Sequence, residues 1–285
     1  MDVFLTGATG FVGTAIAKEL GNRGHRVVAL ARSERAMSVL RGVGLDVHRG
    51  DIAEPQSLVP ALDGVDAVIH TAFNHDFSRY VENCEADRRL LDVLSRALVD
   101  SDKVLIATSG TTVAAPDGLA TENDIGAEQI PRSASEAFLN YAARRVRTGV
   151  VRLPPTVYGR GDTAFVPTLI ALARKHGVSG YVDDGTNRWP AVHRGDAARL
   201  FCDIVERPKA GARYHAVAEE GIAFRTIAET IARGLGLPAE SLPMDRAEEH
   251  FGWLAMFATL DASASGEWTR ATTGWTPRES GLVET

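Results

Sequence analysis

Three glycines near the start of the chain have the spacing of a phosphate-binding turn. Gly7, Gly10 and Gly13 lie in the segment GATGFVG, which follows the apolar run Val3–Thr6 and precedes residues with a helical period. In such a turn the first glycine permits a tight bend, the second lets a diphosphate approach the backbone, and the third lets the helix pack on its strand. The unpaired N–H groups at the helix start then face the phosphates. The segment predicts a dinucleotide site; the alternative is a tight strand-to-helix turn in an unrelated α/β protein.

A basic residue at the end of the second predicted strand bears on which dinucleotide is bound. A site for NAD normally places an acidic side chain there, and that charge would repel an added 2′-phosphate. Here the strand ends in Leu30-Ala31-Arg32-Ser33, with no carboxylate. The guanidinium of Arg32 is a forked donor suited to phosphate, with Ser33 and Arg35 beside it. We therefore predict NADP(H) as the cofactor; the alternative is that Arg32 is a solvated residue at a helix start.

The elements that position these residues alternate between short β-branched runs and amphipathic helical segments, a pattern typical of a parallel sheet covered by helices. The predicted strands are Val3–Thr6, Val27–Ala31, Asp46–Arg49, Ala67–His70, Val104–Thr108 and Gly149–Leu153. Apolar stripes that predict helices include Val12, Ile16 and Leu20; Leu90, Leu91, Leu94 and Leu98; and Ala134, Ala137, Phe138, Tyr141 and Ala142. Later helices are expected near Thr163–His176, Asp196–Glu206 and Arg225–Leu235.

The regular alternation stops at Pro154-Pro155, and this places a soft domain boundary. We expect an α/β protein with a Rossmann-like, doubly wound parallel sheet. Residues 1–155 would form the NADP(H)-binding domain, with segments returning from the C-terminal part, and residues 156–285 a smaller substrate-binding cap.

Composition excludes several other classes of protein. The chain has 285 residues, and its 31 Lys+Arg against 37 Asp+Glu give a formal net charge of −6, with no basic run of the kind that binds nucleic acid. The 2 cysteines, Cys84 and Cys202, are too few for a disulfide framework or a zinc cluster. No signal peptide is visible, and no apolar run approaches the roughly 20 residues that span a bilayer. We expect a soluble, cytoplasmic protein.

Further motifs resemble those of the extended short-chain dehydrogenase/reductase family, which includes nucleotide-sugar epimerases and dehydratases. They are Gly50-Asp51-Ile52, His70-Thr71-Ala72, the segment VRLPPTVYG at residues 151–159, AVHRGD at 191–196 and TGWTP at 273–277. The resemblance implies that Asp51 and Ile52 hold the adenine, that residues 71–73 line the nicotinamide side and that Pro154 stacks near the carboxamide. The full set of predicted cofactor-binding residues is Gly7, Thr9, Gly10, Phe11, Val12, Gly13, Arg32, Ser33, Asp51, Ile52, Thr71, Ala72, Phe73, Thr108 and Pro154.

The family's catalytic residues, a Ser or Thr after the fifth strand and a Tyr-x-x-x-Lys on the next helix, are not conserved in this sequence. Alignment on Val113 puts Gly110 at the hydroxyl position, where Ser109 or Thr111 would have to substitute. No Tyr-x-x-x-Lys occurs anywhere, and counting back from Arg152 puts Glu128 and Arg132 at its two positions. A guanidinium does not deprotonate in proteins, so the roles open to Arg132 are holding the nicotinamide ribose or stabilising a developing alkoxide. Glu128 is either a proton carrier or, in the favoured interpretation, an exposed loop carboxylate.

Other polar and aromatic side chains are candidates for the substrate side. His75 follows the fourth strand at the carboxyl edge, where open α/β sheets bind ligands. Tyr158 and His193 occupy segments that border the substrate in the family, and Tyr158 is also a candidate proton donor. The alternatives are an exposed loop residue for His75 and a loop-orienting role for His193. Aromatic side chains that would wall a pocket or fill the core are Phe77, Tyr80, Trp189 and Trp253.

Together these features predict hydride transfer between NADP(H) and a carbonyl or alcohol of a small organic substrate. Two other interpretations stay open: a nucleotide-sugar epimerase or dehydratase, and a non-catalytic NADP(H) sensor that binds a partner, which the absent Tyr-x-x-x-Lys favours. No metal is expected. The resemblance also implies a possible homodimer through the helices near Asp87 and Phe138.

Overall fold

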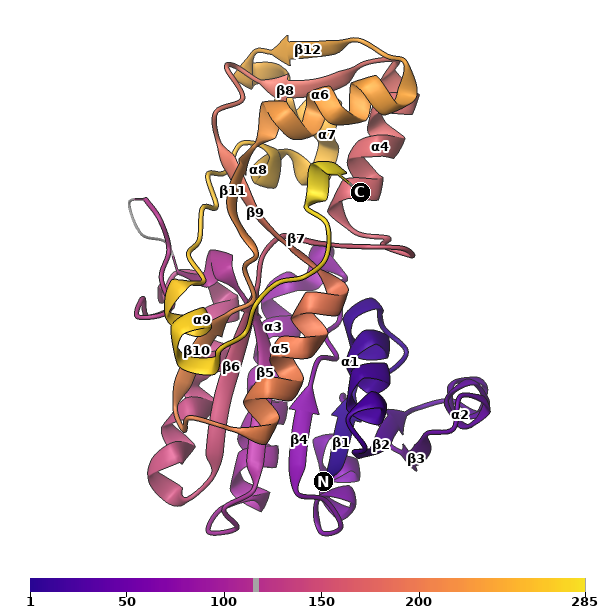
Figure 1. The fold of residues 1–285 in the computed structure, drawn as a ribbon, viewed down its shortest axis with the longest axis vertical. Coiled ribbons are helices and arrows are strands. Elements are labelled where there is room, and N and C mark those ends of the chain that lie inside the picture. The colour runs from indigo at the N-terminus through magenta and orange to yellow at the C-terminus, as the bar shows by residue number, and fades with distance from the viewer. Residues whose placement is uncertain (115–117, 285) are drawn as a thin grey trace.

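A parallel sheet of seven strands forms the lower body of the molecule (Figure 1). The computed structural model describes residues 1–114 and 118–284. The strand order is β10-β6-β5-β4-β1-β2-β3, and every neighbouring pair runs parallel. The strands are β1 Asp2–Thr6, β2 Arg26–Ala31, β3 Asp46–Arg49, β4 Ala67–His70, β5 Val104–Gly110, β6 Arg147–Leu153 and β10 Ala212–His215. The six strands predicted from the sequence are confirmed to within two residues at each end.

Two hydrophobic cores cover the two faces of this sheet. On one face, α1 (Phe11–Asn22) and α5 (Arg194–Glu206) bury Ile16, Leu20 and Phe201 against inward residues of the strands. On the other face, α3 (Tyr80–Ala97) packs with the 3₁₀ segments η1 (Pro55–Leu62) and η4 (Pro131–Arg144). Strands covered on both sides read as apolar runs, as Ala67–His70 and Val104–Ala107 do. This is the Rossmann-like, doubly wound architecture predicted from the sequence.

The segment after β5 differs from its predicted form. Residues 131–144 adopt a 3₁₀ conformation, and of the predicted stripe only Phe138 is buried, while Ala134 and Ala137 are exposed. The reason is the turn repeat of three residues, which puts Arg132, Ser135 and Phe138 on one inward face. The expectation of a regular amphipathic helix here was wrong. Because the segment repeats every three residues, the side chain of Arg132 points into the protein.

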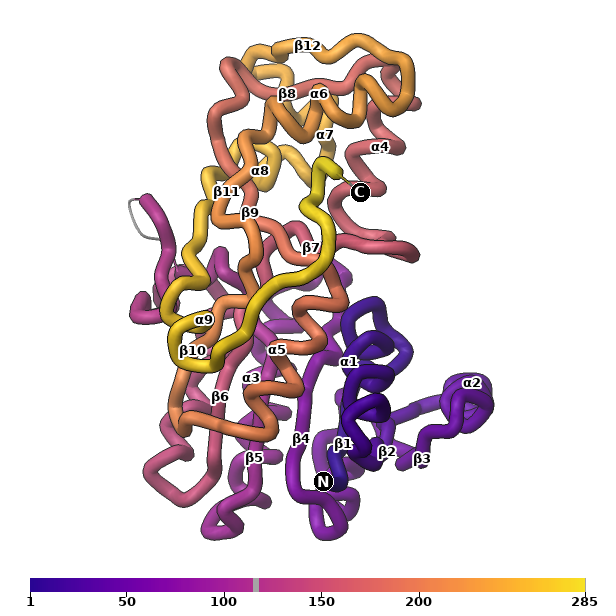
Figure 2. The backbone as a smooth tube through the Cα atoms, in the orientation of Figure 1, coloured from indigo at the N-terminus to yellow at the C-terminus, as the bar shows by residue number. Residues whose placement is uncertain are grey.

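The C-terminal part contributes to both bodies of the molecule. Its strands β7 (Thr156–Tyr158), β9 (Arg188–His193) and β11 (Glu219–Ala223) form a three-stranded sheet, and β8 (Ser179–Val182) pairs with β12 (Ala239–Leu242). With α4 (Phe165–His176), α6 (Phe224–Leu235), α7 (Ala247–Phe251) and α8 (Ala255–Ala258) they build the cap at the top of Figure 1. By contrast α5, β10 and α9 (Glu267–Thr273) return to the lower body, and the tube in Figure 2 shows the last residues running back up toward α4.

The cap lies over the carboxyl ends of the sheet strands, since the chain begins at the opposite end (Figure 1). The remaining helix, α2 (Glu34–Gly42), follows β2 at the outer edge of the sheet. Within the described ranges, none of the helices has both the length and the apolar character needed to cross a membrane.

Candidate active site

The turn between β1 and α1 has the geometry that its glycines predict. Gly7 has a positive φ of +76°, and a Cβ there would lie 2.6 Å from Thr71 Oγ1. A Cβ on Gly13 would lie only 2.0 Å from the carbonyl oxygen of Gly7, so α1 packs on the turn at a distance that only glycine allows. Gly10 precedes α1 and gives it no side-chain cap. The N–H groups of the first turn are thus left for an anion, as a dinucleotide diphosphate requires.

Two other residues of the same turn, Thr9 and Phe11, lie at its rim. Thr9 is exposed, and Phe11 lies under the guanidinium of Arg194, whose Cζ is 4.9 Å from the ring centroid. Val12 packs against the core beside α5. The turn is therefore fixed to the segment 191–196 that joins the cap to the lower body.

Residues predicted to hold the adenosine half line the carboxyl ends of β2 and β3. Arg32 is exposed, and among the residues that the structure describes it makes no hydrogen bond or ion pair. Ser33 caps α2, its Oγ accepting from the N–H of Ala36 at 3.2 Å. Asp51 accepts from the N–H of Ala53 at 3.0 Å, and Ile52 packs against the core. Arg32 is thus a free cation at the end of β2, where a 2′-phosphate would lie if the dinucleotide binds as in a Rossmann domain.

The end of β4 turns sharply beside the glycine turn. Thr71 donates its hydroxyl to the carbonyl oxygen of Thr6 at 2.8 Å, and the N–H of Ala72 donates to Thr6 Oγ1 at 3.3 Å. The ring of Phe73 lies under the guanidinium of Arg132, with Cζ 4.2 Å from its centroid. Pro154, at the end of β6, is buried. The predicted nicotinamide-side residues therefore gather at the carboxyl edge of β4, β5 and β6.

Arg132 is the end of a buried polar chain that starts on β1. Thr6 Oγ1 lies 2.7 Å from His70 Nδ1, His70 Nε2 lies 2.9 Å from one oxygen of Asp87, and Arg132 donates to the other oxygen at 2.6 Å. Arg132 also donates to the carbonyl oxygen of Thr108 at 2.7 Å. Four sheet or helix elements thus hold one guanidinium in place, which is the rigid support that a catalytic or binding group needs.

The protons in this chain can be assigned from the hydrogen-bonding capacity of each group. Thr6 Oγ1 accepts from the backbone N–H groups of Thr71 and Ala72, so its own hydrogen is directed to His70 Nδ1. His70 is then the tautomer protonated at Nε2, which donates to Asp87. Burial pushes the pKa of Asp87 upward, but Arg132 and His70 outweigh it and hold that pKa below its usual range. Asp87 and Arg132 therefore form a charged pair at neutral pH.

The other residues considered as replacements for the missing catalytic groups differ in burial and in hydrogen bonding. Ser109 and Thr111 are buried, and within the described residues their hydroxyls lack hydrogen-bond partners. They flank Gly110, where a Cβ would have no atom closer than 3.5 Å. Glu128 is exposed. The two unpaired hydroxyls lie at the carboxyl end of β5, next to the backbone oxygen that Arg132 contacts.

Tyr158 and His193 lie together, with ring centroids 5.5 Å apart, and the Tyr158 hydroxyl and His193 Nδ1 are already engaged. The Tyr158 hydroxyl donates to the backbone oxygen of Ser280 at 2.6 Å. Burial, with the nearby Glu219 and Asp196, raises its pKa above the usual range. His193 caps α5, its Nδ1 accepting from the N–H of Gly195 at 3.2 Å. As placed, both side chains hold the C-terminal segment and the start of α5.

A continuous series of aromatic rings leads from the carboxyl edge into the cap. The distances between ring centroids are 5.3 Å for Phe73 and His75 and 6.2 Å for His75 and Phe77. Phe77 and Trp253 stack on each other with their centroids 5.5 Å apart. Phe77 is 40% exposed and Trp253 is 54% exposed, so these two form an open surface and do not fill the core. Trp189 is buried, as expected for a core residue. His75 is exposed in the loop after β4, as the alternative interpretation expects, and partial desolvation with the charge of Arg132 lowers its pKa, so the ring is neutral at neutral pH.

A second cluster of buried polar side chains has a structural role. Arg152 is bound by both oxygens of Glu136 at 2.7 and 2.8 Å, and it lies 3.4 Å from His215. Thr269 of α9 donates its backbone N–H and its hydroxyl to Glu122 at 2.8 and 2.6 Å. These contacts attach the segment after β5 and the returning α9 to the edge strand β10 and its neighbour β6.

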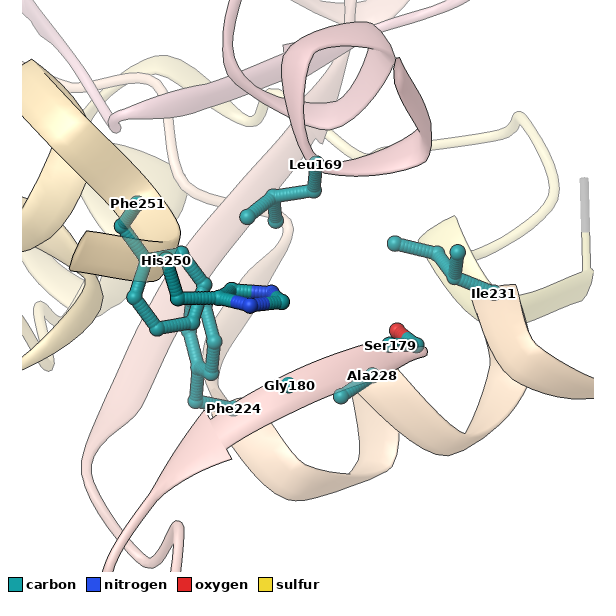
Figure 3. Close-up of a pocket in the computed structure, with 8 residues that line it drawn as sticks. All are labelled: Leu169, Ser179, Gly180, Phe224, Ala228, Ile231, His250 and Phe251. Atoms are coloured by element: carbon teal, nitrogen blue, oxygen red, sulfur yellow. The ribbon is translucent and has the colours of Figure 1, made fainter. Parts of the chain in front are cut away.

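The cap contains a small cavity of its own (Figure 3). Its volume is about 10 Å³, the space of roughly one water molecule, and the ring of His250 points into it between Leu169 and Ile231. It is formed by cap elements only and is too small for an organic substrate. In the described ranges no group of His, Cys, Asp and Glu side chains is arranged to hold a metal.

Sequence and structure comparisons agree with this architecture. The model of the NAD dependent epimerase/dehydratase family matches residues 3–218. The chain belongs to this family. A Schizosaccharomyces pombe protein described as uncharacterised is 43% identical over 286 residues, covering 99% of this chain and 97% of the relative. Membership confirms the resemblance seen in the sequence and gives the chain the NAD(P)-binding, oxidoreductase-like fold of the family.

Two further relatives differ in what their names say they act on or bind. The 2-alkyl-3-oxoalkanoate reductase of Stenotrophomonas maltophilia is 32% identical over 212 residues, covering 70% of this chain and 63% of the reductase. The structure of MoeE5 in complex with UDP-glucose and NAD superposes with a TM-score of 0.75 at 25% identity, covering 100% of this chain and 95% of MoeE5. The chain is therefore similar both to a protein named as an oxoalkanoate reductase and to one whose structure contains UDP-glucose and NAD.

The sequence interpretation did not assign roles to two residues that hold Arg132. They are His70, at the last position of a buried strand, and Asp87. Asp87 lies three residues before Leu90 on the apolar stripe of α3, and a carboxylate on a buried face must be paired. That position was the signal in the sequence that a buried cation faces α3.

Proposed function

We propose that the protein is an NADP(H)-dependent oxidoreductase that transfers a hydride between the nicotinamide and a carbonyl or alcohol of a small organic substrate. The main support for this proposal is that the predicted cofactor-binding residues and Arg132 follow one another along a single edge of the sheet. The glycine turn, built for a diphosphate, leads at the end of β4 to Phe73 and the buried cation Arg132. A dinucleotide that follows this edge would bring its nicotinamide to that pair.

The residues of the chain then have separate roles. Gly7, Gly10 and Gly13 admit the diphosphate, and the first turn of α1 donates to it. Thr71 and Ala72 fix the end of β4 through Thr6. When bound, the reduced nicotinamide supplies the hydride. Arg132 holds a permanent positive charge where the substrate oxygen gains negative charge, and Phe73 restricts water on one side of it.

The aromatic series supports an apolar substrate. Phe77 and Trp253 present open ring surface between the carboxyl edge and the cap, and such surface favours planar or hydrocarbon groups. The reductase relative, which acts on a keto compound by its name, supports a carbonyl substrate. The second candidate is a nucleotide-sugar epimerase or dehydratase, which the similarity to MoeE5 with UDP-glucose favours. A panel of aromatic and aliphatic aldehydes and ketones, tested beside UDP-glucose, separates the two.

The choice of NADP(H) over NAD(H) depends on Arg32. Loss of a charge-assisted contact with phosphate costs about 1.5–3 kcal/mol, which is about tenfold to a hundredfold in affinity. Arg32→Ala should therefore weaken NADPH binding by about this factor and leave NADH binding nearly unchanged, as measured by fluorescence titration. Equal losses for the two cofactors would contradict the preference.

Turnover of any panel compound, followed by the absorbance of the reduced nicotinamide, distinguishes an enzyme from a sensor. Tight NADPH binding without turnover across the panel would favour the sensor. The division into a cofactor domain at residues 1–155, with segments returning from the C-terminal part, and a cap at 156–285 also belongs to this proposal, as do the cytoplasmic location and a homodimer through α3 and η4. Light scattering tests the dimer.

A further inference from the structure

Reduction of a carbonyl needs a proton for its oxygen as well as a hydride for its carbon. Arg132 cannot supply the proton, because a guanidinium does not deprotonate in proteins. His75 is a poor donor at neutral pH, since partial desolvation and Arg132 lower its pKa and leave the ring neutral. The Tyr-x-x-x-Lys pair is absent from the sequence. The proton donor must be another group at the carboxyl edge.

Four of the 5 tyrosines are engaged elsewhere. The hydroxyls of three are hydrogen-bonded, Tyr141 to Asp92, Tyr158 to the Ser280 carbonyl and Tyr214 to the Lys209 N–H. Tyr181 lies on β8 in the cap, and the Arg225 guanidinium covers its ring. The remaining one is Tyr80, the first residue of α3. It follows the loop that leaves the carboxyl end of β4, so its backbone starts at the edge where the nicotinamide is expected.

The position of Tyr80 on α3 relates it directly to Arg132. Tyr80, Cys84 and Asp87 are spaced by four and three residues, which places them on one face of the helix. Cys84 is 1% exposed and Asp87 6% exposed, so this face points inward, and Asp87 holds Arg132. Tyr80 is only half-buried and stacks on Phe77 with ring centroids 5.9 Å apart. Tyr80 therefore lies at the solvent-accessible end of this face of α3, and Asp87, at the buried end, binds Arg132.

The phenol is protonated at neutral pH. Burial, together with the hydrogen bond to the Cys84 thiol beside it, raises the pKa of Tyr80 to about 12, and the charge of Arg132 acts in the opposite direction. Arg132 is thus the group that makes the phenol a stronger acid than burial alone would allow. Once it has donated, the phenolate has a permanent cation nearby, which lowers the cost of leaving a negative charge in a partly buried site.

We propose that Tyr80 is the catalytic acid of this site, donating its hydroxyl proton to the substrate carbonyl oxygen, with Arg132 as the charge partner of the phenolate. The inference rests on the proposed function. In the step, the carbonyl carbon accepts the hydride from the reduced nicotinamide while the C=O π bond breaks. The Tyr80 O–H bond breaks and its proton goes to the oxygen. The products are the alcohol, the oxidised nicotinamide and the phenolate, which regains a proton from water.

The first test compares two substitutions that each remove one hydroxyl. With a carbonyl compound that the wild-type protein reduces, Tyr80→Phe should lower the turnover number by about 10²–10⁴-fold, the usual contribution of a positioned acid. NADPH affinity should stay the same. Tyr141→Phe, which removes a hydroxyl bound to Asp92, is the matched control and should retain turnover. If Tyr80→Phe keeps turnover within about threefold of the wild type, Tyr80 is not the acid.

The second test does not depend on turnover. NMR of tyrosine labelled at Cζ identifies the Tyr80 signal as the one missing in Tyr80→Phe. Adding NADP⁺ should shift that signal, because the positive nicotinamide binds beside the phenol, and should leave the Tyr141 signal in place. An unmoved Tyr80 signal at saturating NADP⁺ would overturn the inference. A protein that binds no nicotinamide cofactor would instead contradict the proposed function itself.

Discussion

The pair of Asp87 and Arg132 offers the sharpest energetic test of how the candidate site is held. Asp87→Asn keeps the shape of the side chain and removes its charge. The side chains are 4% and 11% exposed, and their oxygen and nitrogen are 2.6 Å apart, so water screens the pair little. The substitution would leave the guanidinium buried without a counter-ion, with neutral partners only: the new amide oxygen, Thr108, Ser135 and the ring of Phe73.

The expected magnitude follows from this burial. Removing one partner of a buried ion pair costs about 3–5 kcal/mol, and we expect the lower end, about 3 kcal/mol, because Asn still accepts one hydrogen bond. The pKa of Asp87 is lower in the folded protein than in the unfolded chain. The pair therefore stabilises fully above the unfolded pKa of about 3.9, and this stabilisation is lost as the pH falls toward the folded pKa.

Urea unfolding at several pH values measures both effects. The difference in unfolding free energy between wild type and Asp87→Asn should be about 3 kcal/mol at neutral pH and should shrink below about pH 4. The matched control is Asp92→Asn on the same helix, whose side chain is 34% exposed, pairs with Arg96 and accepts the Tyr141 hydroxyl, a bond that the amide oxygen of Asn can keep. It should cost less than about 1 kcal/mol. A neutral-pH loss below about 1 kcal/mol for Asp87→Asn would refute the assignment of a charged buried pair.

Two further substitutions test the cofactor turn and the aromatic surface. Gly13→Ala should abolish NADPH binding in a fluorescence titration, because its Cβ would lie 2.0 Å from a backbone oxygen. The control is Gly21→Ala on the same helix, whose Cβ would meet nothing within 4 Å and which should bind NADPH normally. Similar NADPH affinities for the two variants would contradict the geometry of the turn. Trp253→Ala removes the cap side of the stack with Phe77 and should raise KM for an aromatic carbonyl compound by roughly tenfold with little change in kcat. Met256→Ala, nearby and 69% exposed, is its control, and equal KM values for the two variants would remove the aromatic surface from substrate binding.

The sequence predicted the part of the fold that local patterns determine. The central strands β1, β4 and β5 are buried on both faces, so each is a short apolar run. Gly7 and Gly13 mark the first turn because a Cβ at either position would clash with neighbouring atoms. The strands of the C-terminal part, such as β8 and β12, are short and have no such pattern. Their pairing depends on long-range contacts, and β10 in particular joins the main sheet only because the chain returns to it.

Within the site, Arg132 was proposed from its register in the sequence, whereas Tyr80 was considered only as an aromatic residue that walls a pocket or fills the core. The register counted back from Arg152 led to Arg132 although the segment is 3₁₀. The contact of Tyr158 with Ser280 spans 122 positions in the chain, so no local pattern reveals that this hydroxyl is engaged. The exposure of Phe77 and Trp253 depends in the same way on how the cap meets the sheet edge.

Parallel equilibrium titrations of the wild-type protein with NADPH and NADH show whether the glycine turn and Arg32 form a site for a phosphorylated dinucleotide. We expect saturable binding of both, tighter for NADPH by about tenfold or more, because Arg32 is an unpaired cation at the end of β2. Failure to bind either dinucleotide would contradict this expectation.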